Sequence, residues 1–173
     1  MASIQNNIII LNEADARFSS NTDVIVASGG VATIQAGTPT KGADAAAASW
    51  TGAVLPMVDG DGSTSQRFTG IAKSTSTDTA AAAGVVTLWL PLAGYMYACK
   101  SKSLTATDTA AEINALFGKR VVFDLTSSLW SIDTAAADAV ANCVTIIGGD
   151  YLTSTVYFNY SPKGSMLGFC ISA

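Results

Sequence analysis

The feature that most constrains this chain is its division into short apolar segments by clusters of glycine, proline, aspartate and serine. Val156, Phe158 and Tyr160 occupy every second position, which is the spacing of a strand with one buried face. Residues 144–147 predict the strand before it, and residues 148–150 (Gly-Gly-Asp) predict the turn between them. Short strands that recur with turn signals are typical of small barrels and sandwiches. We therefore expect a mainly β fold, a small β-barrel or sandwich-like domain.

The sequence Asp-Thr-Ala-Ala occurs three times, at residues 78–81, 108–111 and 133–136. Asp is a strong helix N-cap and Ala the best helix former, so each copy predicts a helix start or a turn. The spacings between the copies are unequal. The motif therefore indicates a local role and not a structural repeat.

The middle copy begins the one short helix that the sequence predicts, over about residues 109–117. Thr109 followed by Glu112 is a capping box, in which each side chain accepts a hydrogen bond from the other residue's backbone amide. Gly118 lies where a left-handed residue commonly ends a helix. The apolar face of this helix consists of Ile113, Leu116 and Phe117.

The start of the chain carries the apolar run Ile8-Ile9-Ile10-Leu11 between polar residues. Four consecutive large apolar side chains cannot all face one side of a strand, so the run is buried on both faces or covered by a partner. We interpret residues 1–20 as an N-terminal arm that pairs as a strand, followed by one β-rich domain over residues 21–173. An ordinary first strand of the domain is the alternative interpretation.

Charged residues make up only 13% of the chain, against 49% hydrophobic residues, so much of the surface is formed by small neutral side chains. Such side chains are easily desolvated and immobilised when a partner covers them, which favours an assembly surface. The net charge of −4 argues against nucleic acid as a partner. The closest basic pairs, Lys100 with Lys102 and Lys119 with Arg120, are interpreted as solvated loop charges.

Neither a secretory signal peptide nor a membrane-spanning apolar run is evident in the sequence. We therefore expect synthesis in a host cytoplasm and no membrane partner.

The sequence contains no histidine, which removes Ser-His-Asp and Cys-His activation, histidine acid–base catalysis and most catalytic zinc sites. Glu13 and Glu112 are the only glutamates, and the aspartates lie mostly in turn contexts. Asp59-Gly60-Asp61-Gly62 resembles the opening of a calcium loop, but Thr64 and Gly70 occupy positions where that motif needs glycine and glutamate. We expect no enzyme activity, no catalytic residues, no metal and no cofactor.

Cysteine and tryptophan have structural interpretations in this sequence. The three cysteines are odd in number and widely spaced, so they fit neither a disulfide framework nor a zinc site and are interpreted as buried thiols. They are Cys99, Cys143 and Cys170. The tryptophans lie in or beside apolar segments and are interpreted as core or interface residues. They are Trp50, Trp89 and Trp130.

Three segments in the first half of the chain carry a resemblance to a known family. They are residues 38–42 (TPTKG), residues 67–72 (RFTGIA) and residues 83–92 (AGVVTLWLPL). A Gly-x-Ala strand followed soon by a glycine-led apolar strand resembles the head decoration, or cement, proteins of tailed phages. The resemblance covers roughly residues 20 to 100 and does not account for residues 105–173.

This resemblance implies a β-rich virion protein, frequently a homotrimer, on the outer surface of the capsid. Its partners would be the major capsid protein and copies of itself, and its role would be to stabilise the shell. In such proteins an N-terminal arm commonly pairs with capsid subunits. That role would fall on Ile8, Ile9, Ile10 and Leu11.

Two other classes of function remain open from the sequence. One is another structural component of a virion or a bacterial surface layer, such as a fibre, spike or tail protein. The other is an enzyme or small-molecule binder with a carboxylate site, which a deep polar pocket holding two or more aspartates would favour.

Overall fold

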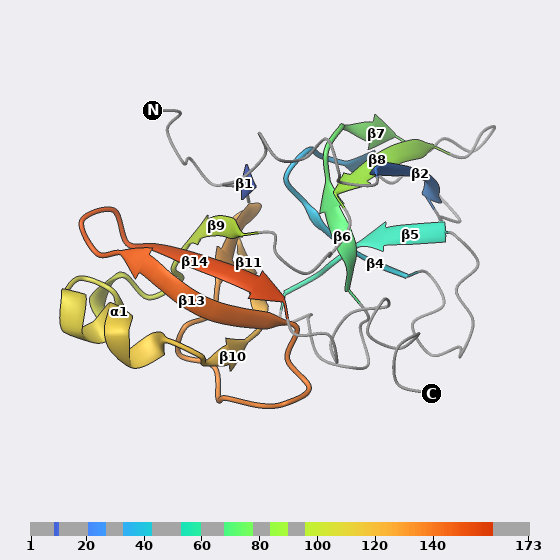
Figure 1. Ribbon diagram of the computed structural model, residues 1–173. Coiled ribbons are helices and arrows are strands. Elements are labelled where there is room, and N and C mark those ends of the chain that lie inside the picture. Colours follow the sequence, from blue (N-terminus) through green and yellow to red (C-terminus); the bar gives the residue numbers. More distant parts are fainter. Residues whose placement is uncertain are drawn as a thin grey trace.

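A computed structural model describes residues 9–10, 21–26, 33–42, 53–59, 68–77, 84–89 and 96–160, and the fold of this part is mainly β (Figure 1). The strands of the first half are β1 (Ile9–Ile10), β2 (Asn21–Val26), β3 (Thr33–Ile34), β4 (Pro39–Gly42), β5 (Ala53–Pro56), β6 (Phe68–Ala72), β7 (Ser76–Thr77) and β8 (Val85–Trp89). The second half has β9 (Tyr97–Lys100), the 3-10 turn η2 (Leu104–Ala106), α1 (Ala110–Leu116), β10 (Arg120–Val121), β11 (Phe123–Thr126), β12 (Leu129–Ile132), β13 (Val144–Asp150) and β14 (Thr155–Tyr160). The expected mainly β fold with one short helix is confirmed.

Five strands of the first half close into a barrel in the order β2-β5-β4-β6-β8, with β8 pairing back onto β2. The pairings are antiparallel except for β2 with β5. A small two-stranded sheet, β3 with β7, lies beside the barrel. Five buried side chains of this half form one apolar cluster: Ile34, Val54, Ala72, Val86 and Leu88.

The second half forms an antiparallel sheet in the order β1-β9-β14-β13-β10, together with the hairpin β11–β12. The larger apolar core joins this half to the barrel. Phe68 of β6 lies with its ring centroid 5.5 Å from those of both Phe123 and Tyr160. Met57, Ile71 and Trp89 belong to the same buried cluster. The barrel and the five-stranded sheet therefore share a core, which offsets the cost of ordering the chain.

The predicted helix is confirmed together with its caps. Thr109 Oγ1 accepts a hydrogen bond from Glu112 N at 3.3 Å, and the Glu112 carboxylate accepts one from Thr109 N at 3.1 Å. Ile113 and Leu116 are buried, and Gly118 has a φ of 81°. Phe117, expected on the apolar face, is exposed instead because it is the C-cap residue, where the chain leaves the helix.

The prediction of a turn at residues 148–150 is wrong. Strand β13 continues to Asp150, and the turn follows at residues 151–154. Gly148 marks a bulge in the pairing with β14 and has a φ of 156°. A Cβ on Gly149 would lie 2.6 Å from the carbonyl oxygen of Thr155 and 2.9 Å from Ile113 Cδ1. These glycines permit the close packing of α1 and β14 on β13, and they do not turn the chain.

The other local expectations divide between confirmed ones and ones outside the described residues. The third Asp-Thr-Ala-Ala copy forms the expected turn, in which Asp133 Oδ1 accepts hydrogen bonds from Ala135 N and Ala136 N at 3.1 Å each. Outside the described residues lie the first copy at 78–81, Gly60-Asp61-Gly62, Trp50, Cys170, Ile8, Leu11 and the rest of the arm at 1–20 except Ile9 and Ile10.

Candidate functional site

The segment expected to pair as a strand is described at two residues. Ile9 pairs with Ala98 and Ile10 with Tyr97, so β1 lies antiparallel to β9 at the edge of the five-stranded sheet (Figure 1). At these two residues the pairing partner is the chain's own sheet, as in the first-strand alternative. Binding of Ile8, Ile9, Ile10 and Leu11 to a capsid stays a prediction.

The described tryptophans and cysteines are core residues, as expected. Trp89 and Trp130 are buried, and so are the side chains of Cys99 and Cys143. Burial raises the pKa of Cys99 to about 12, so its thiol carries almost no nucleophilic thiolate at neutral pH.

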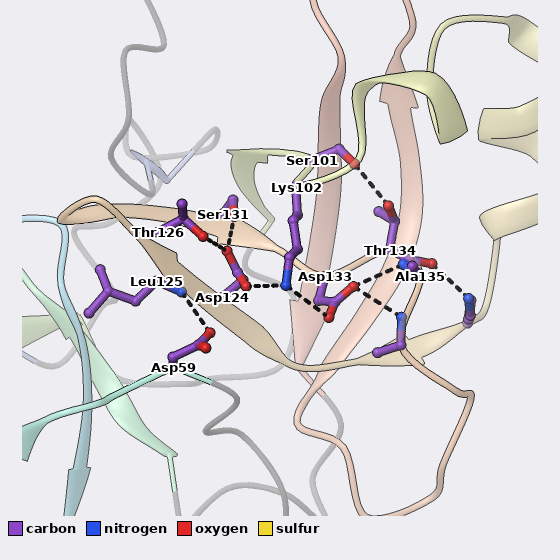
Figure 2. Close-up of polar contacts among 12 residues, drawn as sticks. Asp59, Ser101, Lys102, Asp124, Leu125, Thr126, Ser131, Asp133, Thr134 and Ala135 are labelled. Carbon is purple, nitrogen blue, oxygen red and sulfur yellow. Dashed lines mark hydrogen bonds and ion pairs between the residues drawn. The ribbon is translucent and has the colours of Figure 1, made fainter.

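The most connected polar site of the described chain is the Lys102 cluster, which consists of Asp59, Lys102, Asp124 and Asp133 (Figure 2). Lys102 Nζ lies 2.5 Å from Asp124 Oδ1 and 3.6 Å from Asp133 Oδ2. Asp59 Oδ1 accepts a hydrogen bond of 3.2 Å from the backbone amide of Leu125, the residue after Asp124. The cluster thus joins the ends of β5, β9 and β12 to β11.

Asp124 is the buried member of the cluster, with 2% of its side chain exposed, whereas Lys102 is 45% exposed. Thr126 Oγ1 and Ser131 Oγ donate hydrogen bonds of 2.9 and 3.1 Å to Asp124 Oδ2. Burial alone would raise the pKa of Asp124, but the hydrogen bonds from Lys102, Thr126 and Ser131 outweigh it and lower that pKa.

The same contacts shift the pKa of Lys102 in the opposite direction from the pKa of Asp124. Its hydrogen bond to Asp124 raises the pKa of Lys102, and the charges of Asp133, Asp124 and Asp59 add to the effect. Both partners therefore remain charged near neutral pH. The Lys102 ammonium provides the positive charge among the three carboxylates of the cluster. Within the described ranges, no group of three or more acidic, cysteine or histidine residues is arranged to hold a metal ion. The arrangement holds chain segments together.

Sequence reasoning missed this cluster because Lys102 was interpreted as a solvated loop charge. Lys102 does lie in a loop with 45% of its side chain exposed, but it also pairs with the buried carboxylate of Asp124, 22 positions further along the chain. Asp124 carried a usable signal: it lies between Phe123 and Leu125 in a strand, where aspartate is unfavourable unless it has partners.

The second basic pair, Lys119 and Arg120, also forms hydrogen bonds within the chain. Arg120 Nε and Nη2 donate to Asp138 Oδ1 and Oδ2 at 2.9 and 3.2 Å, and Lys119 Nζ donates to Thr134 O at 2.7 Å. These contacts fasten the loop between β12 and β13 to the start of β10.

A second group of candidate residues lies on η2, α1 and the β13–β14 turn, and α1 and that turn lie on the same side of the five-stranded sheet (Figure 1). Ser101 N donates to Ser154 O at 2.9 Å, which holds the segment before η2 against that turn. These elements expose large apolar side chains, including Phe117 at 70% and Leu152 at 79%. We call η2, α1 and this turn the helical end, and the exposed large apolar residues on these elements are Leu104, Phe117, Tyr151 and Leu152.

Comparisons with protein-family models, with curated proteins and with solved structures found no match for this chain. Among the helices in the described part of the chain, none is long and apolar enough to cross a membrane.

Proposed function

We propose that this chain is a structural protein of a virion that binds the outer surface of a phage capsid and stabilises the shell. The observation that carries the proposal is the placement of the three segments with the decoration-protein resemblance. They correspond to β4, β6 and β8, which are successive neighbours in the barrel. Segments separated by loops in the sequence thus belong to one packed unit.

The two glycines of that resemblance lie at close contacts in this unit. A Cβ on Gly70 in β6 would lie 2.5 Å from the carbonyl oxygen of Trp89 in β8, and one on Gly84 would lie 2.8 Å from Ser76 Oγ. The Gly70 distance is shorter than a contact with backbone allows, so glycine is needed there, whereas a Cβ on Gly84 would crowd the Ser76 hydroxyl and the Thr77 backbone at 3.0 Å. The Gly-x-Ala pattern therefore has a steric reason in the barrel, and the glycine that leads the second pattern lies close to β7, which supports treating the two patterns as a fold signature.

The surface composition also suits a protein that functions by contact with other proteins. The helical end presents large apolar side chains on a chain with few charges. Exposed large apolar side chains mark a contact site for a partner protein where they form a contiguous patch. On a capsid, symmetric repetition would multiply such modest contacts into high avidity.

The arm and the oligomer are the finer parts of the proposal. Residues 8–11 would add a strand to a capsid subunit, gaining main-chain hydrogen bonds and side-chain pockets. Because Ile9 and Ile10 pair with β9 in the chain alone, capsid binding would exchange this pairing for one with the shell protein. The bound protein would be a homotrimer.

A sedimentation assay with capsids tests the function and the arm separately. We expect the full chain to sediment with capsids and a chain lacking residues 1–12 to remain folded in the supernatant. A matched control, the double variant Phe117→Ser and Leu152→Ser, leaves the arm intact and measures the contribution of the helical end. Undiminished binding by the truncated chain would refute the arm, and no binding by the full chain would refute the function.

A further inference from the structure

We propose that the Lys102 cluster is a charge latch that fixes the outer edge and turn of the β11–β12 hairpin against the barrel and opens in acid. The latch concerns the chain alone and does not depend on the proposed function. It is inferred from the contacts of Figure 2, which join segments that are far apart in the sequence.

The hairpin is fastened from both of its long sides. On the β11 side, the carboxylate of Asp59, which follows β5, accepts a hydrogen bond from the Leu125 amide. This amide points away from β12 and therefore has no partner in the β11–β12 ladder. On the β12 side, Lys102 N donates to Ile132 O at 2.9 Å, and the Lys102 side chain reaches across to Asp124. The side-chain contact of the latch therefore needs both the ammonium of Lys102 and the carboxylate of Asp124 in their charged forms.

The turn that the latch fixes is conformationally strained. Ser127 and Ser128 have φ values of 51° and 64°, a two-residue hairpin turn in which asparagine and glycine are the favoured residues. Such backbone conformations persist where surrounding contacts determine them. Here the bond from Thr126 Oγ1 to Asp124 Oδ2 connects the turn to the charged cluster. Loss of the Asp124 charge would weaken this connection and allow the turn to relax.

The pH dependence follows from the charged groups that face Asp124 and Lys102: Asp59 after β5, Lys102 after β9 and Asp133 after β12. The pKa of Asp124 is lowered, so its contribution is complete above the ordinary value of about 3.9 and is lost as pH falls through the folded pKa. The pKa of Lys102 is raised, so its contribution is complete below about 10.4 and is lost as pH rises through its folded pKa. The latch is closed between these limits.

The apolar core beneath the hairpin limits the opening to its edge. Phe123 packs against Phe68 with ring centroids 5.5 Å apart and against Trp130 at 6.3 Å. These contacts do not titrate, so protonation releases the outer edge and the turn while the core remains packed. Opening is thus distinguishable from unfolding.

Amide hydrogen exchange of the full chain, corrected for the intrinsic pH dependence, tests the latch. As the pH falls from about 7 through the lowered folded pKa of Asp124, we expect the protection of the Leu125 amide to fall progressively. The Met57 amide, which donates to Pro39 O at 2.9 Å in the barrel, serves as the internal control and keeps its protection. Equal losses at the two amides, or full protection of Leu125 in acid, would overturn the proposal.

Three variants separate the latch from a general effect of charge. Lys102→Met is expected to move the midpoint of Leu125 opening upward by about one pH unit or more, because Asp124 loses its positive partner. Asp124→Asn leaves Asp59 in place as the acceptor of the Leu125 amide, so it is expected to lower the protection of that amide at neutral pH and to reduce the acid step. Asp138→Asn removes an exposed ion pair outside the cluster and should change neither. A wild-type acid step in Asp124→Asn, or an unmoved midpoint in Lys102→Met, would contradict the latch.

Discussion

Replacement of Gly70 by alanine probes the packing that places the three decoration-like segments in one barrel. Gly70 has a φ of 153° and lies in the middle of β6. An added Cβ would lie 2.5 Å from the Trp89 carbonyl oxygen and 3.4 Å from Leu88 Cβ. Because the close atom belongs to the β8 backbone, no side-chain rotation can relieve the contact. The strands must separate or the pairing must shift.

The expected cost combines two effects. A non-glycine residue in this backbone region costs about 1 to 3 kcal/mol, and overpacking a well-packed contact costs about 1 to 3 kcal/mol more. The Gly70→Ala variant should therefore lose about 2 to 6 kcal/mol of unfolding free energy. Gly118→Ala is the matched control, since its φ is 81° and a Cβ there meets nothing within 4 Å. It should lose only about 1 to 2 kcal/mol.

Urea unfolding followed by tryptophan fluorescence measures both variants. Trp89 is the contact residue in β8 and Trp130 reports on the second half, so the two halves contribute to one signal. We expect the Gly70→Ala midpoint to lie below the Gly118→Ala midpoint with similar denaturant slopes. If Gly70→Ala is as stable as Gly118→Ala, the approach of β6 to β8 is wrong, and the steric explanation of the glycine pattern fails with it.

Two further predictions concern the helix and the buried thiol. Thr109→Ala removes the N-cap of α1 and should lower the unfolding free energy by about 1 kcal/mol in the same urea assay; an unchanged midpoint would contradict the observed capping box. Because the pKa of Cys99 is about 12, iodoacetamide at about pH 8 should leave Cys99 unmodified in the native protein and alkylate it in urea. Peptide mass spectrometry checks this, and rapid native alkylation of Cys99 would contradict its burial.

The parts of the fold that sequence predicted are those determined by local chemistry. The limits of α1 follow from Thr109, Glu112 and Gly118, which interact within the helix or end it. The alternation in β14 predicts its buried face because Val156 and Phe158 point to one side of the strand. Neither prediction needs knowledge of distant segments.

The features that the sequence did not predict depend on contacts between segments that are far apart along the chain. Gly149 resembles a turn residue in sequence, but the contacts that require glycine come from Thr155 and Ile113. The Lys102 cluster depends on segments that only the tertiary fold brings together.

The central claim is that this chain belongs to the outer surface of a virion, and the composition of purified virions tests it most directly. If the proposal is correct, quantitative mass spectrometry of particles of a phage whose genome encodes the chain should detect it at a fixed ratio to the major shell protein, together with trimeric density on the capsid exterior in averaged images. Absence of the chain from purified particles, while it accumulates in infected cells, would contradict the claim.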